Sequence, residues 1–188
     1  MDPAFKCIAA GRTGHTVLGL QLYHLTIGHV FLLVEHGVDF IVESNIEPSF
    51  DDLILFTFLA AQPTPRGASR AVSSPLTRPL FWLWGLLSRR KRFDDELAKL
   101  REYVTEQYKA PLVKEPTGSS KALNAPEHWR LLAMLVADFH FTLDQALNTS
   151  MLFARALWAV QGERTDKVEL VYSPATERAL RRLRAQTK

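Results

Sequence analysis

The sequence predicts a mainly α-helical protein: an irregular multi-helix bundle with at most a short strand or two, near the N-terminus and around residues 168–172. Three observations support this fold class. Apolar residues recur at helical spacing in several long segments, helix-capping residues precede these segments, and alternation of apolar and polar residues is confined to short stretches.

The segment 124–162 forms the predicted central helical core, because it combines high apolar content with clear capping signals. Its first helix is expected to start after a cap at Asn124 or Ala125 and to reach about Phe139. Pro126 suits the first turn of that helix, where a backbone N–H would have no helical partner.

Two further helices are predicted in the same segment. Thr142 and Gln145 have the spacing of a capping box, which predicts a short helix at residues 143–147. Asn148, Thr149 and Ser150 offer a cap for a third helix at 151–161. Gly162 is expected to end that helix in the left-handed conformation.

Both long helices of the central core are apolar on nearly every side, which is typical of helices that are buried on several sides. We therefore expect their large apolar side chains to form the protein core or an interface with a partner. The candidate partner-binding residues are Trp129, Leu132, Val136, Phe153, Leu157 and Trp158.

Residues 1–61 are expected to form the N-terminal helical part of the core. Thr26 is a predicted cap, Gly37 a predicted helix end, and Ser49 with Asp52 repeats the capping pattern. The elements expected in this part are a strand at 16–23, a helix at 27–36, an extended piece at 38–42 and a helix at 50–61.

A change of composition marks residues 62–92. Pro, Gly and Ser are frequent in residues 62–79, which predicts a loop or linker. The apolar run LFWLWGLL and four basic residues follow, and an amphipathic helix is expected at 93–109, with Glu96 on its outer side. A second loop is expected at 110–123.

The chain ends in a basic extension, residues 163–188, with seven Lys or Arg against four Asp or Glu. That difference equals the net charge of +3 of the whole chain. We expect a last helix opened by Ser173 and Pro174, on which a basic patch lies. The patch consists of Arg178, Arg181, Arg182 and Arg184.

Length and cysteine content set further bounds. A chain of 188 residues can bury about 70% of its unfolded surface without a metal or disulfide. The single cysteine, Cys7, excludes an internal disulfide and fits a reducing cytoplasm. The N-terminal residues lack the pattern of a secretion signal, and no apolar run is long enough to predict a membrane-spanning helix.

The sequence predicts no catalytic residue, metal site or cofactor. His29 and His36 lie two helical turns apart, but with Cys7 they match neither a CxxC pair nor HExxH. Gly11, Gly14 and Gly19 do not have the spacing of a nucleotide-binding loop. A non-enzymatic protein is therefore expected.

Two other functions stay open. The basic C-terminal helix could contact nucleic acid, although the apolar helix at 151–161 is unlike a DNA-reading helix. The segment Phe81, Trp82 and Trp84 could lie in a membrane interface, because aromatic side chains favour the headgroup boundary and the following basic run attracts anionic lipid.

Two stretches of the chain resemble small helical proteins of tailed phages and prophages described as tail-assembly or tape-measure chaperones. The resemblance lies in LYHLTIGHVFLLVEHGVDFIV with FDDLILFTFLAAQP, and in HWRLLAMLVADFHFTLDQALNTSMLFARALWAVQGE, together covering residues 17–61 and 127–163. It implies a cytoplasmic protein of a bacterial host that binds another protein, a long helical tail protein, or associates with itself. It implies no catalytic residues.

Overall fold

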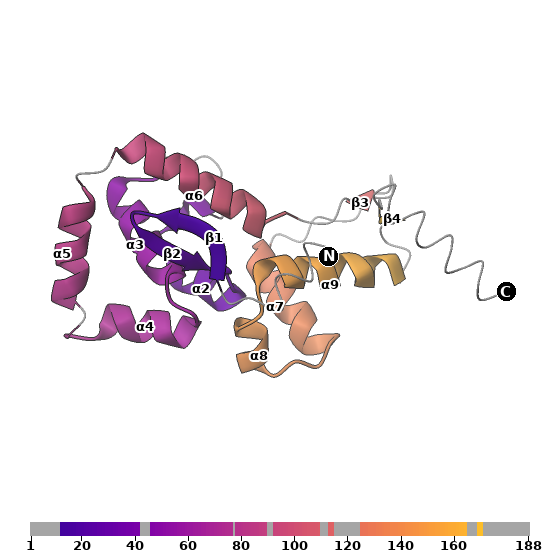
Figure 1. Cartoon of the computed structure of the whole chain (residues 1–188). Helices are drawn as coiled ribbons and strands as arrows, with labels where there is room; N and C mark the ends of the chain where they lie inside the picture. Colours follow the sequence, from indigo (N-terminus) through magenta and orange to yellow (C-terminus); the bar gives the residue numbers. More distant parts are fainter. Residues whose placement is uncertain are drawn as a thin grey trace.

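A computed structural model describes residues 12–41, 46–76, 78–89, 92–109, 113–114, 125–164 and 169–170. In these ranges the chain is mainly helical, with two short antiparallel pairs of strands, so the predicted fold class is confirmed. Figure 1 shows α5 at the left end of the molecule, the N-terminal hairpin between α3 and α6, and α7 to α9 towards the right.

The N-terminal hairpin consists of β1 (Arg12–Val17) and β2 (Leu20–Tyr23). The prediction of one strand at 16–23 was wrong, because the chain reverses inside that range. Leu18 and Gly19 both have positive φ, at 51° and 86°, as the two central residues of a tight hairpin turn require. The sequence hid this turn because leucine rarely adopts that conformation.

Helix α2 (Ile27–Glu35) begins at a capping box of Thr26 and His29 and is followed by Gly37 at φ 79°, so its predicted cap and end are confirmed. The extended piece expected at 38–42 was wrong: a 3₁₀ turn, η1 (Asp39–Ile41), stands there. Val38 donates its N–H to the Leu33 carbonyl at 2.9 Å, which keeps the chain folded back on α2.

Helix α3 (Phe50–Ala60) starts at the predicted capping box of Ser49 and Asp52. The loop expected at 62–79 was wrong, because α4 (Pro65–Ser73) and the first residues of α5 (Arg78–Ser88) lie there. Thr64 caps α4 by accepting the Gly67 N–H at 3.1 Å. Pro65 fits as the first helical residue, so a proline that suggested a loop begins a helix.

The amphipathic helix expected at 93–109 is present as α6 (Phe93–Gln107), which ends two residues earlier, and the outward orientation of Glu96 was wrong. Glu96 is buried and its carboxylate accepts the Leu18 N–H at 2.5 Å. At the other end of α6, Gln107 accepts the Leu25 N–H at 3.1 Å. Tyr103 donates its hydroxyl to the Tyr23 carbonyl at 2.6 Å. Polar side chains thus attach α6 to the hairpin.

The central core contains α7 (Glu127–Ala137), α8 (Leu143–Leu147) and α9 (Met151–Arg164). The bounds of α8 and its capping box are confirmed. The cap predicted at Ala125 was wrong: Pro126 is the N-cap residue of α7. Its ψ of 148° is extended, so Pro126 lies outside the helix and not in its first turn. Asn124 lies outside the described residues. The predicted ends at Phe139 and Gly162 were wrong, since α7 is two residues shorter and α9 continues past the glycine.

Backbone hydrogen bonds join the two halves of the described chain. Thr26 and Ser150 form an isolated antiparallel bridge. Beside it, Ile27 donates its N–H to the Thr149 carbonyl at 3.0 Å, and Met151 donates to the Leu25 carbonyl at 2.8 Å. Buried residues from the hairpin and from helices on both sides of this bridge belong to one hydrophobic cluster, so the halves share a core.

Several predictions fall partly or wholly outside the described residues. Short strands β3 (Val113–Lys114) and β4 (Glu169–Leu170) pair antiparallel, and β4 lies within the range where a C-terminal strand was expected. The rest of the loop at 110–123, the helix opened by Ser173 and Pro174, and Cys7 are outside the described ranges.

Candidate binding surfaces

Helix α7 turns an apolar face to solvent. Its buried residues are His128, Leu131, Met134 and Leu135. Trp129 and Val136 lie on the opposite side, 54% and 40% exposed, while Leu132 is half-buried. Two of the candidate partner-binding residues, Trp129 and Val136, thus lie on the outer side of the helix, and a different set fills the core.

A ring contact with Phe31 fixes the orientation of the Trp129 side chain. Its ring packs edge-on against Phe31 of α2, with 4.7 Å between centroids and an interplanar angle of 87°. Phe31 makes a similar contact with His128, also at 4.7 Å. Such contacts limit the rotamers of an exposed indole, so Trp129 can meet a partner with little further loss of side-chain entropy.

Helix α9 presents its apolar residues on more than one side. Phe153 and Leu157, four residues apart, share a face and are half-buried, whereas Trp158 lies on another side and is 38% exposed. Arg155 connects the helix to its neighbours through an ion pair with Glu127 at 2.7 Å and a position 5.6 Å above the Tyr108 ring. The six candidate residues therefore do not form one face.

Helix α5 has apolar side chains all round. Phe81 and Trp84 turn inward against Phe58 of α3, with ring centroids 4.7 Å and 6.1 Å away. Of the three residues assigned to an interfacial segment, only Trp82 faces solvent, with 66% of its surface exposed. Sequence reasoning missed the outward leucines. A plot at 100° per residue could have found them, once the segment was treated as a helix.

The outward apolar face of α5 contains six residues. They are Pro79, Leu80, Trp82, Leu83, Leu86 and Leu87.

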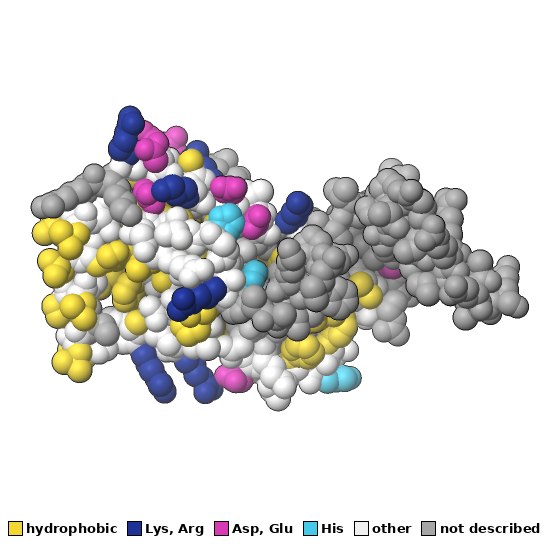
Figure 2. All heavy atoms as spheres, viewed as in Figure 1, with side chains coloured by type: hydrophobic (Ala, Val, Ile, Leu, Met, Phe, Trp, Pro, Cys, Tyr) yellow, Lys and Arg dark blue, Asp and Glu magenta, His cyan; other side chains and the backbone are white. Residues whose placement is uncertain are grey.

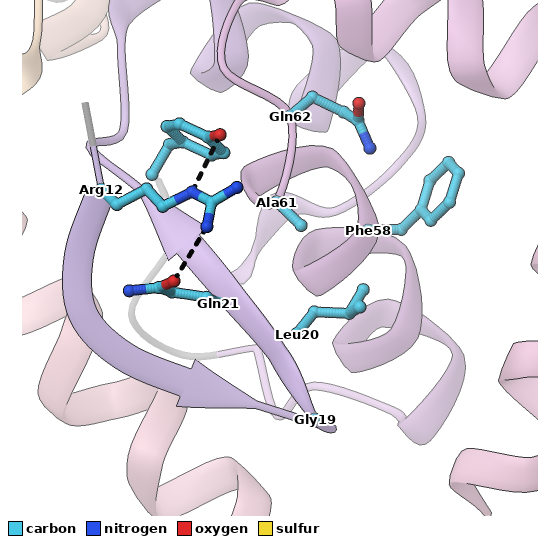
Figure 3. A pocket seen from close by; sticks show the side chains of 8 residues that line it. Arg12, Gly19, Leu20, Gln21, Phe58, Ala61 and Gln62 are labelled. Atoms are coloured by element: carbon cyan, nitrogen blue, oxygen red, sulfur yellow. Dashed lines mark hydrogen bonds between the residues drawn. The ribbon is translucent and has the colours of Figure 1, made fainter.

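A shallow depression of about 350 Å³ lies between the hairpin and α3 (Figure 3). Arg12 reaches across it and donates to the Tyr23 hydroxyl at 3.0 Å and to the Gln21 side-chain oxygen at 3.3 Å. Leu20 and Phe58 supply apolar walls. Both partners of the guanidinium are neutral, so an anionic group would suit the site. The sequence offered no motif that could have indicated it.

The histidines weighed as metal ligands have other roles where the structure describes them. His29 is buried beside Thr26 at the start of α2, and His36 follows the last residue of that helix. The described ranges contain no group of three or more His, Cys, Asp or Glu placed to hold a metal ion.

None of the described helices is both long and apolar enough to cross a bilayer. The predicted basic patch of Arg178, Arg181, Arg182 and Arg184 lies outside the described residues.

Taken together, the described chain is a small helical protein with apolar surfaces on α5 and α7. Searches of protein-family models, curated proteins and solved structures find no match to it.

Proposed function

We propose that this chain is a non-enzymatic protein-binding protein that covers an apolar helical segment of another protein. The observation that supports the proposal is the outer face of α7. There Trp129 and Val136 stay exposed although both are large and apolar, and Phe31 fixes the position of the indole. Rigid exposed tryptophans are frequent among the residues that dominate binding energy.

An amphipathic helix is the partner chemistry that we propose. Trp129, Ala133 and Val136 are four and three residues apart, so they follow one another along the same side of α7. A partner helix can place its own apolar residues along such a row at the same repeat. The resemblance to tail-assembly chaperones supports the narrower proposal that the partner is a long helical tail protein.

The experiment compares three forms of the tagged full-length chain: the natural sequence, Trp129→Ala and Trp82→Ala. Each is produced in the cells that normally make it, purified after nuclease treatment at low and moderate salt, and its bound proteins are identified by mass spectrometry. The two tryptophans are matched, since both are more than half exposed but lie on α7 and α5.

We expect a long helical tail protein to accompany the natural chain and Trp82→Ala. It should be lost from Trp129→Ala, because truncating a central aromatic anchor costs about 2 kcal/mol or more. Recovery of the same protein by all three forms would contradict the assignment to α7. Recovery of only nucleic-acid-associated proteins that disappear with nuclease or salt would contradict protein binding and favour the basic C-terminal patch.

A further inference from the structure

The outward apolar face of α5 has no polar side chain among its described residues. Leu80, Leu83 and Leu87 follow the i, i+3, i+7 repeat, with Trp82 and Leu86 four residues apart beside them. These five side chains are between 50% and 67% exposed. A surface helix of a globular protein normally turns charged or polar residues outward, so this face suits an apolar environment.

The orientation of α5 is fixed by its opposite side. Phe81 and Trp84 pack on Phe58, and Gly85 is buried against Ile54. A Cβ atom added at Gly85 would lie 3.5 Å from two side-chain carbons of Ile54, at ordinary van der Waals distance, so the two helices pack directly on each other here. Rotating α5 to bury its leucines would expose these aromatic contacts, so the outward face is a stable feature of the fold.

The segment of sequence that contains this face is basic. Residues 53–93 contain seven Lys or Arg and no Asp or Glu, although the whole chain carries a net charge of only +3. Arg70 lies on α4 and Arg89 and Arg92 follow α5, whereas Arg66 lies in the first turn of α4 and pairs with α8. In Figure 2, hydrophobic side chains line the left edge of the molecule over α5, and Lys or Arg side chains project below it near α4.

Three of these arginines form ion pairs with carboxylates. Arg66 pairs with Asp144 at 3.0 Å, Arg89 with Asp51 at 2.6 Å, and Arg92 with Asp95 at 3.9 Å. In all three pairs both side chains are more than half exposed, and ion pairs of this kind contribute little to stability. The guanidinium groups can therefore exchange these carboxylates for phosphate oxygens at little cost.

We propose that α5 anchors this protein to the surface of an anionic lipid bilayer, lying in the plane of the membrane. The leucines enter the acyl boundary, Trp82 occupies the headgroup level, and the flanking arginines bind lipid phosphates. An eleven-residue helix is about 16 Å long, which fits an orientation along the membrane and not across it.

The shape of the molecule favours lipid over a protein partner at this site. Helix α5 forms one end of the molecule (Figure 1), and the side chains of its outward face are exposed there. The depression of Figure 3 is lined by residues of the hairpin, α3 and the two residues after α3, and by none of the outward residues of α5. A protruding apolar helix with cations beside it is complementary to an anionic membrane surface.

The test uses the purified full-length chain and vesicles of phosphatidylcholine, with or without about 30% phosphatidylserine. Binding is measured by co-sedimentation, and insertion by the blue shift of tryptophan fluorescence. We expect binding to the anionic vesicles that weakens when salt is raised from about 0.1 M to about 0.5 M. The affinity of the chain for vesicles without phosphatidylserine should be at least tenfold lower. Each Lys or Arg that no longer meets an anionic lipid lowers the affinity about fivefold.

Variants assign the binding to α5. Trp82→Ala should weaken binding about tenfold and remove most of the blue shift, while Trp129→Ala should bind like the natural chain. The double variant Leu83→Glu with Leu86→Glu should abolish binding, and unchanged circular dichroism would show that it is folded. Replacing Arg89 and Arg92 by Gln should weaken binding to anionic vesicles only.

Three results would overturn the proposal. The first is no binding of the natural chain to anionic vesicles. The second is binding that survives the Leu83→Glu, Leu86→Glu change. The third is a natural chain that does not bind vesicles but forms oligomers in analytical sedimentation, while the Leu83→Glu, Leu86→Glu variant stays monomeric. That result would mean that this face binds a second copy of the chain. None of these results bears on the protein-binding surface of α7, which Trp129→Ala tests separately.

Discussion

His29 is both a capping residue and a buried ionisable group. Its Nδ1 lies 2.9 Å from the Thr26 hydroxyl at the start of α2, and its side chain is fully buried. Burial lowers the pKa of its imidazole to about 4, against a smaller opposing effect from the backbone of Gln62. Burial also lowers the pKa of His128. Both groups are therefore expected to be neutral in the folded protein at neutral pH.

This predicts that the free energy of unfolding falls as the pH drops from about 6.5 towards about 4. In that window the unfolded chain takes up a proton at His29 that the folded chain does not. The contribution of His29 is about 3 kcal/mol across the window. Urea unfolding at several pH values measures it.

His29→Gln supplies the control for this pH dependence. Its side-chain oxygen can still accept the Thr26 N–H, but it cannot titrate. The variant should lose less stability than the natural chain between the same two pH values, with His128 and the carboxylates accounting for what remains. An identical pH dependence of both proteins would contradict the role of His29.

Gly28 lies where α2 meets α4 and α8. A Cβ atom at this position would stand 2.5 Å from Pro65 Cγ and 2.9 Å from the Leu147 carbonyl oxygen. Since neither the proline ring nor the backbone can yield easily, Gly28→Ala should destabilise the fold by about 1–3 kcal/mol. Gly14→Ala is the matched control, because no atom lies within 4 Å of its added Cβ. Equal midpoints of thermal unfolding for the two variants would refute the prediction.

At the scale of the element, helix starts follow local chemistry. The capping boxes at Thr142 and Ser49 are formed by side chains three residues apart, so the sequence alone could predict them. The box at Ser49 includes a hydrogen bond from the Asp52 N–H to the serine hydroxyl at 3.2 Å and one from the Ser49 N–H to the carboxylate at 2.8 Å.

Ser49→Ala should therefore lower the free energy of unfolding by about 1 kcal/mol, because one N–H at the start of α3 loses its acceptor. Ser69→Ala, inside α4, is the control with the same chemical change. It should be neutral or slightly stabilising, since alanine has the higher helix propensity. Denaturant unfolding of both variants measures the difference. A cost at Ser69 equal to that at Ser49 would argue against capping as the cause.

Helices α4 and α5 show how the same residue types can serve different elements. Proline and glycine in residues 62–79 favoured a loop, yet Pro65 starts α4 and Gly67 donates its N–H to the cap. Gly85 lies inside α5, where an added Cβ would make ordinary contact with Ile54 at 3.5 Å. Whether a proline begins a helix or interrupts one depends on the contacts that the following residues find, and those contacts are distant in sequence.

At the scale of the whole molecule, the two described halves depend on each other. The Thr26–Ser150 bridge, with its neighbouring hydrogen bonds, joins α2 to the start of α9. The core draws on Leu22 and Val30 from one half and on Leu135 and Met151 from the other. Neither half can open here without exposing apolar surface of both.

The chain should accordingly unfold in one transition. Far-ultraviolet circular dichroism reports all helices, while tryptophan fluorescence reports both α5 and the α7–α9 region. We expect the two signals to give the same midpoint in a thermal or urea titration. Two separate midpoints would mean that the halves unfold independently, in spite of the hydrogen bonds between them.

What the sequence determined by itself was local. It predicted the mainly helical class, α6, the three capping boxes or caps at Thr26, Ser49 and Thr142, and the limits of α8. These features depend on residues within one or two helical turns. That is the range over which side chains can bond the helix ends and apolar positions can form a stripe.

Only the tertiary structure decided which apolar faces are covered. Trp129 and Leu135 have similar apolar character in the sequence. Packing of α7 against α2 and α9 buries Leu135 and leaves Trp129 exposed. Glu96 is buried because the hairpin brings the Leu18 N–H to it from far along the chain. In α5 too, contacts with α3 selected the inner face and left Trp82 with the leucines outside. Burial depends on which elements meet, and that is not encoded in any single stretch.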